Sequence, residues 1–113
     1  HISIVLILNH KNMSTLKVRV DQEKLDKAAY VLKCVAHPVR ISIIDLLEQR
    51  ERLTVSQLQE VLSIEQSLLS HHLTNMRDKG IVKTQREGKN VYYSLTDTTI
   101  TTIIECIKGS KVF

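Results

Sequence analysis

Glycine and proline are scarce in this chain of 113 residues, which has three of the first and one of the second. Because these two residues punctuate turns, their scarcity favours helices joined by short connections and argues against a β-sandwich or a disordered chain. Apolar residues make up 42% and charged residues 25%, as in an ordinary globular protein. The length suits one compact domain and is too short for two ordinary ones.

Cysteine is scarce as well, and motifs for catalysis are missing. Cys34 and Cys106 form neither a CxxC pair nor a zinc-binding spacing, so no disulfide framework is expected. The chain has no glycine-rich phosphate loop, nucleophile motif or paired-carboxylate motif. We therefore predict a protein that is not an enzyme, takes no cofactor and keeps its thiols reduced in the cytoplasm.

Long apolar runs are also absent. The run from residue 2 to residue 8 is too short to span a bilayer and lacks the basic flank and cleavage site of a signal peptide, so no membrane partner is expected. Met13 is a candidate natural start, which makes residues 1–12 an added or upstream-derived segment. The expected parts are an N-terminal extension over residues 1–20, partly disordered, a domain over residues 21–109 and a tail over residues 110–113.

Helical periodicity predicts the first half of the domain. Residues 21–36 carry a core stripe and, roughly opposite, a mixed stripe of Lys27, Tyr30, Val31 and Cys34. The mixed stripe can pack on a partner or be an exposed side with a few apolar residues. The core stripe comprises Leu25, Ala28, Ala29, Leu32, Val35 and Ala36.

Three more helices are expected before residue 80. Pro38 suits the first turn of a helix that reaches Gln49. Residues 54–57 fit a capping box that opens a short helix, and residues 63–66 repeat the signal for a longer one that ends before Gly80. The residues of the short helix expected to face the core are Leu58, Val61 and Leu62.

The remaining residues predict a hairpin and a last helix. The stretches Val82–Arg86 and Val91–Leu95 alternate and are rich in β-branched and aromatic side chains, as strands are, and residues 87–90 suit a turn between them. Asp97 can cap a last helix, whose apolar stripe comprises Ile100, Ile103, Ile104 and Ile107.

Two adjacent histidines fall on different sides of the long helix. At about 100° per residue, His72 projects onto an apolar side and His71 onto a polar side, so the two cannot easily share a metal ion. His72 is therefore expected to be a packed, hydrogen-bonded histidine under the helix. The apolar side comprises Ile64, Leu68, Leu69, Leu73 and Met76.

The polar side of this helix consists of short hydrogen-bonding side chains, where exposed helices ordinarily carry pairs of Lys and Glu. Such groups can approach base edges in the major groove of DNA. The segment from Ser70 to Leu95 has five basic and two acidic side chains, a net charge of +3, which favours polyanion binding. A surface helix that happens to be rich in Ser and Gln is the plain alternative. The polar side comprises Gln66, Ser67, Ser70, His71, Thr74 and Arg77.

Three motifs then occur in one order: AHPxR at residues 36–40, QSxxSHHLxxxRxxGxV at residues 66–82 and REGKxVYYSL at residues 86–95. Over residues 28–96 the chain resembles the ArsR/SmtB family of bacterial winged-helix repressors. The resemblance implies a mainly α fold with a small β-hairpin, a winged helix-turn-helix in the order α-α-α-α-β-β-α, that forms a homodimer through its first and last helices. It also implies a repressor that binds an imperfect palindrome in double-stranded DNA.

The resemblance also places the DNA contacts. The family's base-contacting positions fall on Gln66, Ser67, Ser70 and His71, and its wing falls on residues 86–90. Arg77 and the basic hairpin are expected to hold phosphates. The positions expected to contact the DNA backbone are Thr74, Arg77, Lys83, Arg86, Lys89, Asn90 and Tyr92.

Two types of metal site used by family members are incomplete here. Thr54 and Ser56 stand where one type has a Cys-x-Cys pair. Of the Asp and His ligands that the other type has on the last helix only Asp97 is matched, and the later positions hold Thr99, Ser110 and Phe113. Zinc and thiophilic metals need several His or Cys ligands, so neither type of metal site is predicted.

Two alternative functions stay open. A winged-helix module that contacts protein and has lost DNA binding would have apolar or acidic groups on the polar side of the long helix. A thiol-redox-sensing repressor would use Cys34 and Cys106, which lie off the predicted core stripes of the first and last helices. There they can meet at the dimer interface, although two buried, inert cysteines are the ordinary case.

Overall fold

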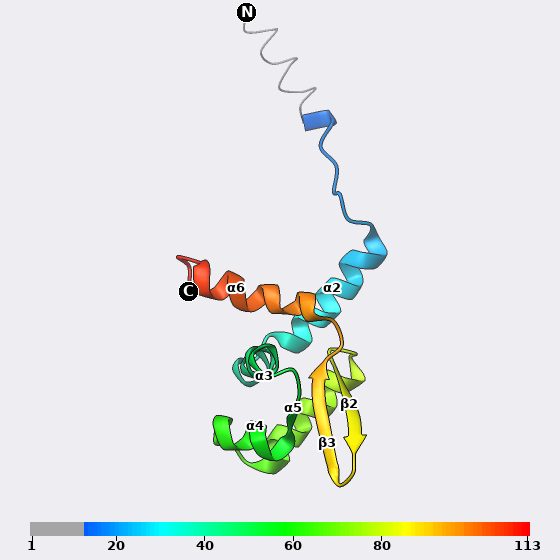
Figure 1. Cartoon of the computed structure of the whole chain (residues 1–113). Coiled ribbons are helices and arrows are strands. Elements are labelled where there is room, and N and C mark those ends of the chain that lie inside the picture. Colours follow the sequence, from blue (N-terminus) through cyan, green and yellow to red (C-terminus); the bar gives the residue numbers. More distant parts are fainter. Residues whose placement is uncertain (1–12) are drawn as a thin grey trace, which may run out of the picture.

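The computed structural model describes residues 13–113 (Figure 1), and the statements below concern this part of the chain. Its elements follow the predicted succession of four helices, a hairpin and a last helix, with one strand added between the second and third helices. They are α2 (Gln22–Val35), α3 (Pro38–Gln49), β1 (Leu53–Thr54), α4 (Val55–Leu62), α5 (Gln66–Asp78), β2 (Val82–Glu87), β3 (Asn90–Leu95), the 3₁₀ turn η1 (Thr98–Thr101) and α6 (Thr102–Gly109).

The capping residues explain where the middle helices begin and end. Thr54 Oγ1 accepts a hydrogen bond from the Gln57 amide at 3.2 Å, and Gln57 Oε1 accepts one from the Thr54 amide at 2.9 Å, which confirms the predicted capping box. The second predicted capping box is wrong. Ser63 instead ends α4 in the left-handed conformation with φ 53°, and Glu65 precedes α5 without a side-chain cap.

The sheet has three antiparallel strands in the order β1-β3-β2. Glu87 lies opposite Asn90, which leaves a two-residue turn in which Gly88 takes φ 60°, a conformation that glycine adopts without strain. The short strand β1 lies opposite Tyr92 and Tyr93 of β3. The predicted hairpin is thus confirmed, and the third strand is an addition that the sequence did not indicate.

The hydrophobic core lies where α3, α4, α5 and β2 meet. Figure 1 shows α2 and α6 crossing at one end of the body, with α4, α5 and the hairpin at the other end. At the crossing, α6 adds Ile104 to the core and α2 adds Cys34 and Val35. The largest fully buried side chains are Ile43, Ile44, Leu58, Leu69, Leu73, Met76 and Val82.

The face that α2 turns toward the core differs from the predicted one. Cys34 and Val35 are buried and Val31 is half-buried, whereas Leu25 and Leu32 are 37% and 54% exposed. Only the C-terminal part of α2 therefore packs on the body. Part of the predicted mixed stripe faces the core, and part of the predicted core stripe faces solvent. Cys34 is a core residue, so its predicted place off the core stripe is wrong.

Two further apolar side chains lie outside the core against prediction. Val61 in α4 is 62% exposed and Leu68 in α5 is 46% exposed. Their neighbours Leu58 and Leu69 are fully buried and take the central positions on each helix. The apolar side of each helix is therefore narrower than the sequence pattern predicts.

Candidate nucleic-acid interface

One side of α5 is accessible and carries short polar side chains. Ser70 is half-buried, and the other residues of this side are exposed, namely Gln66, Ser67, His71, Thr74 and Arg77. The opposite side is buried through Leu69, Leu73 and Met76. All four predicted base-contacting residues thus lie together on one face of a single helix, which has the dimensions to enter the major groove of DNA.

The turn after α5 fixes the helix relative to the hairpin. Gly80 has φ 77°, and its amide donates to the Arg77 carbonyl at 2.9 Å while the Ile81 amide donates to the Met76 carbonyl at 2.9 Å. These bonds satisfy carbonyl groups that the helix end would otherwise leave free. The chain therefore passes from α5 into β2 through an ordered connection.

The tip of the hairpin, here called the wing tip, consists of residues 86–90. Arg86, Lys89 and Asn90 are exposed there. Lys83 lies nearer the start of β2 and lines a hollow together with Glu48 and Glu51. Lys83 therefore lies farther from the wing tip than Arg86 and Lys89 do, which makes it the weaker candidate for a phosphate contact.

Tyr92, a predicted backbone contact, is half-buried and covered by an arginine. The guanidinium carbon of Arg52 lies 4.1 Å from the centroid of the Tyr92 ring. Arg52 Nη1 is also 2.6 Å from Glu87 Oε2 at the wing tip. Sequence reasoning missed Arg52, because its partners are distant in sequence and its only local signal is its charge.

His72 is buried beneath the polar face, as predicted, with 4% of its surface exposed. Arg40 Nε donates to His72 Nδ1 at 3.0 Å, and the ring centroids of His37 and His72 lie 4.4 Å apart. Since Nδ1 accepts, the neutral ring carries its proton on Nε2, which is buried without a partner. Burial lowers the pKa of His72, and the nearby His37, Arg40 and His71 lower it further.

Acid is expected to destabilise the protein through His72. Its pKa is lower in the folded chain than its ordinary value of 6.5, so the stability it contributes is complete above that pH and is lost as the pH falls. Urea unfolding from about pH 5 to about pH 8 measures this dependence. His72→Gln keeps an acceptor for Arg40 and cannot titrate, so its stability should vary less over this range. Equal slopes in both proteins would contradict the assignment.

The two cysteines lie in different environments. Cys34 is buried, and Arg40 Nη1 donates to its carbonyl oxygen at 2.9 Å and contacts its Sγ at 3.4 Å. Cys106 is exposed on α6, and both thiols are free. Within one chain, the structure does not join the two predicted redox residues.

Asp97 caps η1. Its Oδ1 accepts hydrogen bonds from the Thr99 amide at 2.9 Å and from the Thr99 hydroxyl at 2.8 Å. Both bonds lower the pKa of Asp97, and the bond from the amide has the larger effect.

Across residues 13–113, no group of three or more His, Cys, Asp or Glu side chains is placed to hold a metal ion. In the same range, no helix has the length and apolar character needed to cross a membrane.

Two helices joined by a tight turn, with an exposed polar second helix and a basic wing beside it, define a DNA-binding transcriptional regulator of the winged helix-turn-helix class. The chain belongs to the ArsR family of bacterial regulatory proteins, the ArsR/SmtB family. The sequence model described as "Bacterial regulatory protein, arsR family" matches residues 37–84.

Relatives of known structure agree with this assignment. The transcriptional repressor PagR of Bacillus anthracis is 34% identical over 89 residues, which are 79% of this chain and 89% of that protein. Its crystal structure has a TM-score of 0.71 and matches 77% of this chain and 99% of its own. HlyU from Vibrio cholerae, named a transcriptional activator, has a TM-score of 0.70 at 33% identity and matches 77% of this chain and 94% of its own. The predicted family, fold and regulatory class are therefore confirmed, and this family is not one of enzymes.

Proposed function

We propose that this protein represses transcription by binding, as a homodimer, an imperfect palindrome in double-stranded DNA. The observation that carries the proposal is the exposed polar face of α5 beside the basic wing tip. Short polar side chains can read base edges in the major groove, and arginines and lysines can hold the phosphates on either side. A protein with this role acts where the DNA is, which in a bacterium is the cytoplasm.

Each predicted contact has a role in this proposal. Gln66, Ser67, Ser70 and His71 contact base edges. The backbone contacts are Thr74 and Arg77 on α5 and Lys83, Arg86, Lys89, Asn90 and Tyr92 on the hairpin, with Lys83 the weakest candidate for the reason given above. No specific observation favours a protein-interaction module without DNA binding or a thiol-redox switch, so neither is proposed.

The selection of bound duplexes from a random DNA pool tests the proposal. Two symmetry-related copies should enrich an imperfect palindrome whose half-sites are one helical turn apart, about 10–10.5 base pairs, or a multiple of that. The release of bound protein by competitor DNA of scrambled sequence should require a large excess. A pool that shows no enrichment after several rounds would overturn sequence-specific binding.

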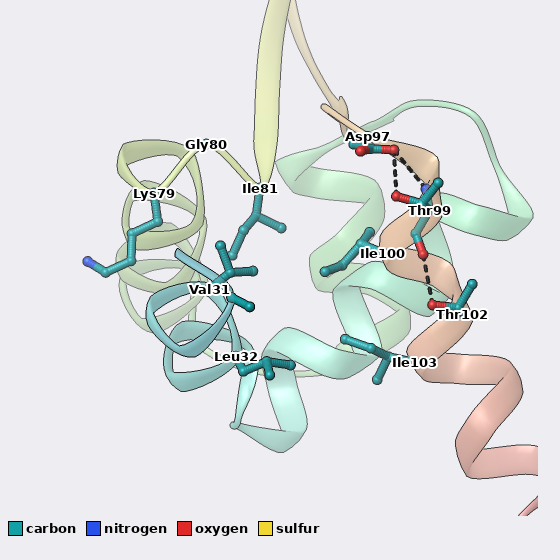
Figure 2. A pocket seen from close by; sticks show the side chains of 11 residues that line it. Val31, Leu32, Lys79, Gly80, Ile81, Asp97, Thr99, Ile100, Thr102 and Ile103 are labelled. Carbon is teal, nitrogen blue, oxygen red and sulfur yellow. Dashed lines mark hydrogen bonds between the residues drawn. The ribbon is translucent and has the colours of Figure 1, made fainter. Parts of the chain in front are cut away.

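Apolar surface on α2 and α6 supports the dimer. A pocket of about 400 Å³ lies between α2, residues 79–81, η1 and the start of α6, and aliphatic side chains, among them Ile100 and Ile103, form most of its lining (Figure 2). Leu32 borders it and is 54% exposed, and Tyr30 on the same helix is 55% exposed. A second copy packed on α2 and α6 would cover this surface.

Sedimentation equilibrium is expected to give a dimer. Leu32→Glu should give a folded monomer, because the side chain is half exposed in the single chain and a charge at a dimer interface is costly. Lys33→Glu, which changes the charge at the adjacent exposed position, is the control and should stay dimeric. A wild-type protein that is monomeric at all concentrations would remove the dimer and with it the argument for a palindrome.

The wing tip is expected to contribute affinity without sequence preference. Arg86→Ala or Lys89→Ala should weaken binding to every duplex and should reduce the slope of log affinity against log salt by about 0.9 for each phosphate that is no longer neutralised. Lys17→Ala removes an exposed lysine from the segment before α2, which lies far from the hairpin tip (Figure 1), and it should leave the slope unchanged. Fluorescence anisotropy with operator and scrambled duplexes at several salt concentrations measures both quantities.

A further inference from the structure

Arg52 connects the helix-turn-helix to the wing through its guanidinium group. It lies between α3 and β1, with Nη1 2.6 Å from Glu87 Oε2 and its guanidinium carbon 4.1 Å from the centroid of the Tyr92 ring. Glu87 ends β2, and Tyr92 lies on β3. One planar cation therefore touches both strands of the hairpin, through the Glu87 carboxylate on β2 and the Tyr92 ring on β3.

The charge of Glu87 explains why such an interaction matters. The wing tip carries the cations Arg86 and Lys89, and Glu87 lies between them in sequence as its one carboxylate. DNA binding by cations at a phosphate backbone is an electrostatic effect, and a carboxylate at the same place opposes it. With Arg52 paired to Glu87, the remaining charges of the wing tip are both positive.

We propose that Arg52 is a positioning residue for DNA binding, which neutralises Glu87 and holds the wing tip in place by stacking on Tyr92. This inference rests on the proposed function, since it assumes that the wing lies on phosphates. The side chains of Arg52 and Glu87 are 44% and 51% exposed, and an exposed ion pair contributes little to folding. The loss of Arg52 therefore acts on DNA affinity and leaves the stability of the fold nearly unchanged.

A double-mutant cycle with a fluorescein-labelled random-sequence duplex tests the proposal, because binding to phosphates needs no operator. Arg52→Ala should weaken binding about 3- to 10-fold at low salt, and Glu87→Gln alone should bind as tightly as wild type or slightly more tightly. In the Glu87→Gln background, Arg52→Ala should cost clearly less than in wild type, because no carboxylate is left to neutralise and only the stacking on Tyr92 is lost. Arg52→Lys keeps the charge without the planar stacking and should lie between wild type and Arg52→Ala.

Melting temperatures and salt slopes identify the outcomes that overturn the inference. A loss of affinity that is as large in the Glu87→Gln background as in wild type, together with a slope reduced by about 0.9, would show that Arg52 itself binds a phosphate. An undiminished loss without that change in slope would show that Arg52 does not act through Glu87, and a lowered melting temperature would then identify a purely structural role. Normal binding by Arg52→Ala while Lys89→Ala binds weakly would refute the inference and leave the proposed function intact. A wild-type protein that binds neither this duplex nor any selected one would refute both.

Discussion

Replacement of Gln66, Ser70 or His71 by Ala is expected to weaken binding to the selected operator by about 1–3 kcal/mol, which is about 5- to 150-fold. These side chains lie on the accessible face of α5 and can form hydrogen bonds to base edges. The affinity for a scrambled duplex should stay nearly constant, because non-specific binding depends on the phosphates. Titration of each variant against both duplexes at fixed salt measures the difference between them.

The adjacent histidine provides a control for this experiment. His72 is buried and bonded to Arg40, so His72→Ala should lower the melting temperature, and operator affinity should fall only as far as the folded fraction falls. His71→Ala should melt like wild type and lose operator preference. The reverse pattern would mean that the polar face of α5 is not the face that reads DNA.

Leu69→Ala is expected to lower the free energy of unfolding by about 2–5 kcal/mol, the largest stability effect predicted for this chain. Leu69 is 0% exposed and lies in the core between α5 and the elements beneath it, so its truncation leaves a cavity that the surrounding side chains cannot fill. For a domain of this size, that loss corresponds to a fall of roughly 8 °C or more in the melting temperature. Urea unfolding at pH 7 measures the free energy directly.

The neighbouring leucine is the matched control. Leu68 is 46% exposed, so Leu68→Ala removes the same atoms with a much smaller change in buried area and should cost less than about 1 kcal/mol. Equal destabilisation by the two substitutions would show that α5 is rotated relative to the structure. The rotation would move the polar face with it, so this stability measurement also bears on the DNA interface.

Local signals in the sequence predicted those features that depend on residues close in the chain. The capping box at residues 54–57 needs only side chains three positions apart, and the turn at Gly88 needs only a residue that tolerates positive φ. The burial of His72 followed from the helical period, because the apolar residues on its side of α5 are numerous. The polar face of α5 followed from the same projection.

Features that depend on docking between distant segments were not predictable in this way. The short strand β1 has two residues and so carries no period, and it is a strand because β3 lies beside it. Helix α2 has apolar residues on both predicted stripes, and packing against the body, rather than sequence, decides that Cys34 is buried and Leu32 exposed. No local sequence pattern indicates that Arg40 bonds His72 or that Arg52 pairs with Glu87, because the fold alone brings these distant residues together.

The pairing of β1 with β3 ties the wing to the helix-turn-helix at a second place besides the turn after α5, since β1 leads directly into α4. In the proposed function, we therefore expect the hairpin and α5 to move together, so that a signal releases both from DNA at once. In the proposed dimer, each copy then moves as one unit relative to the other. A change at the dimer interface alters the distance between the two copies of α5, so each copy binds or releases its half-site as a whole.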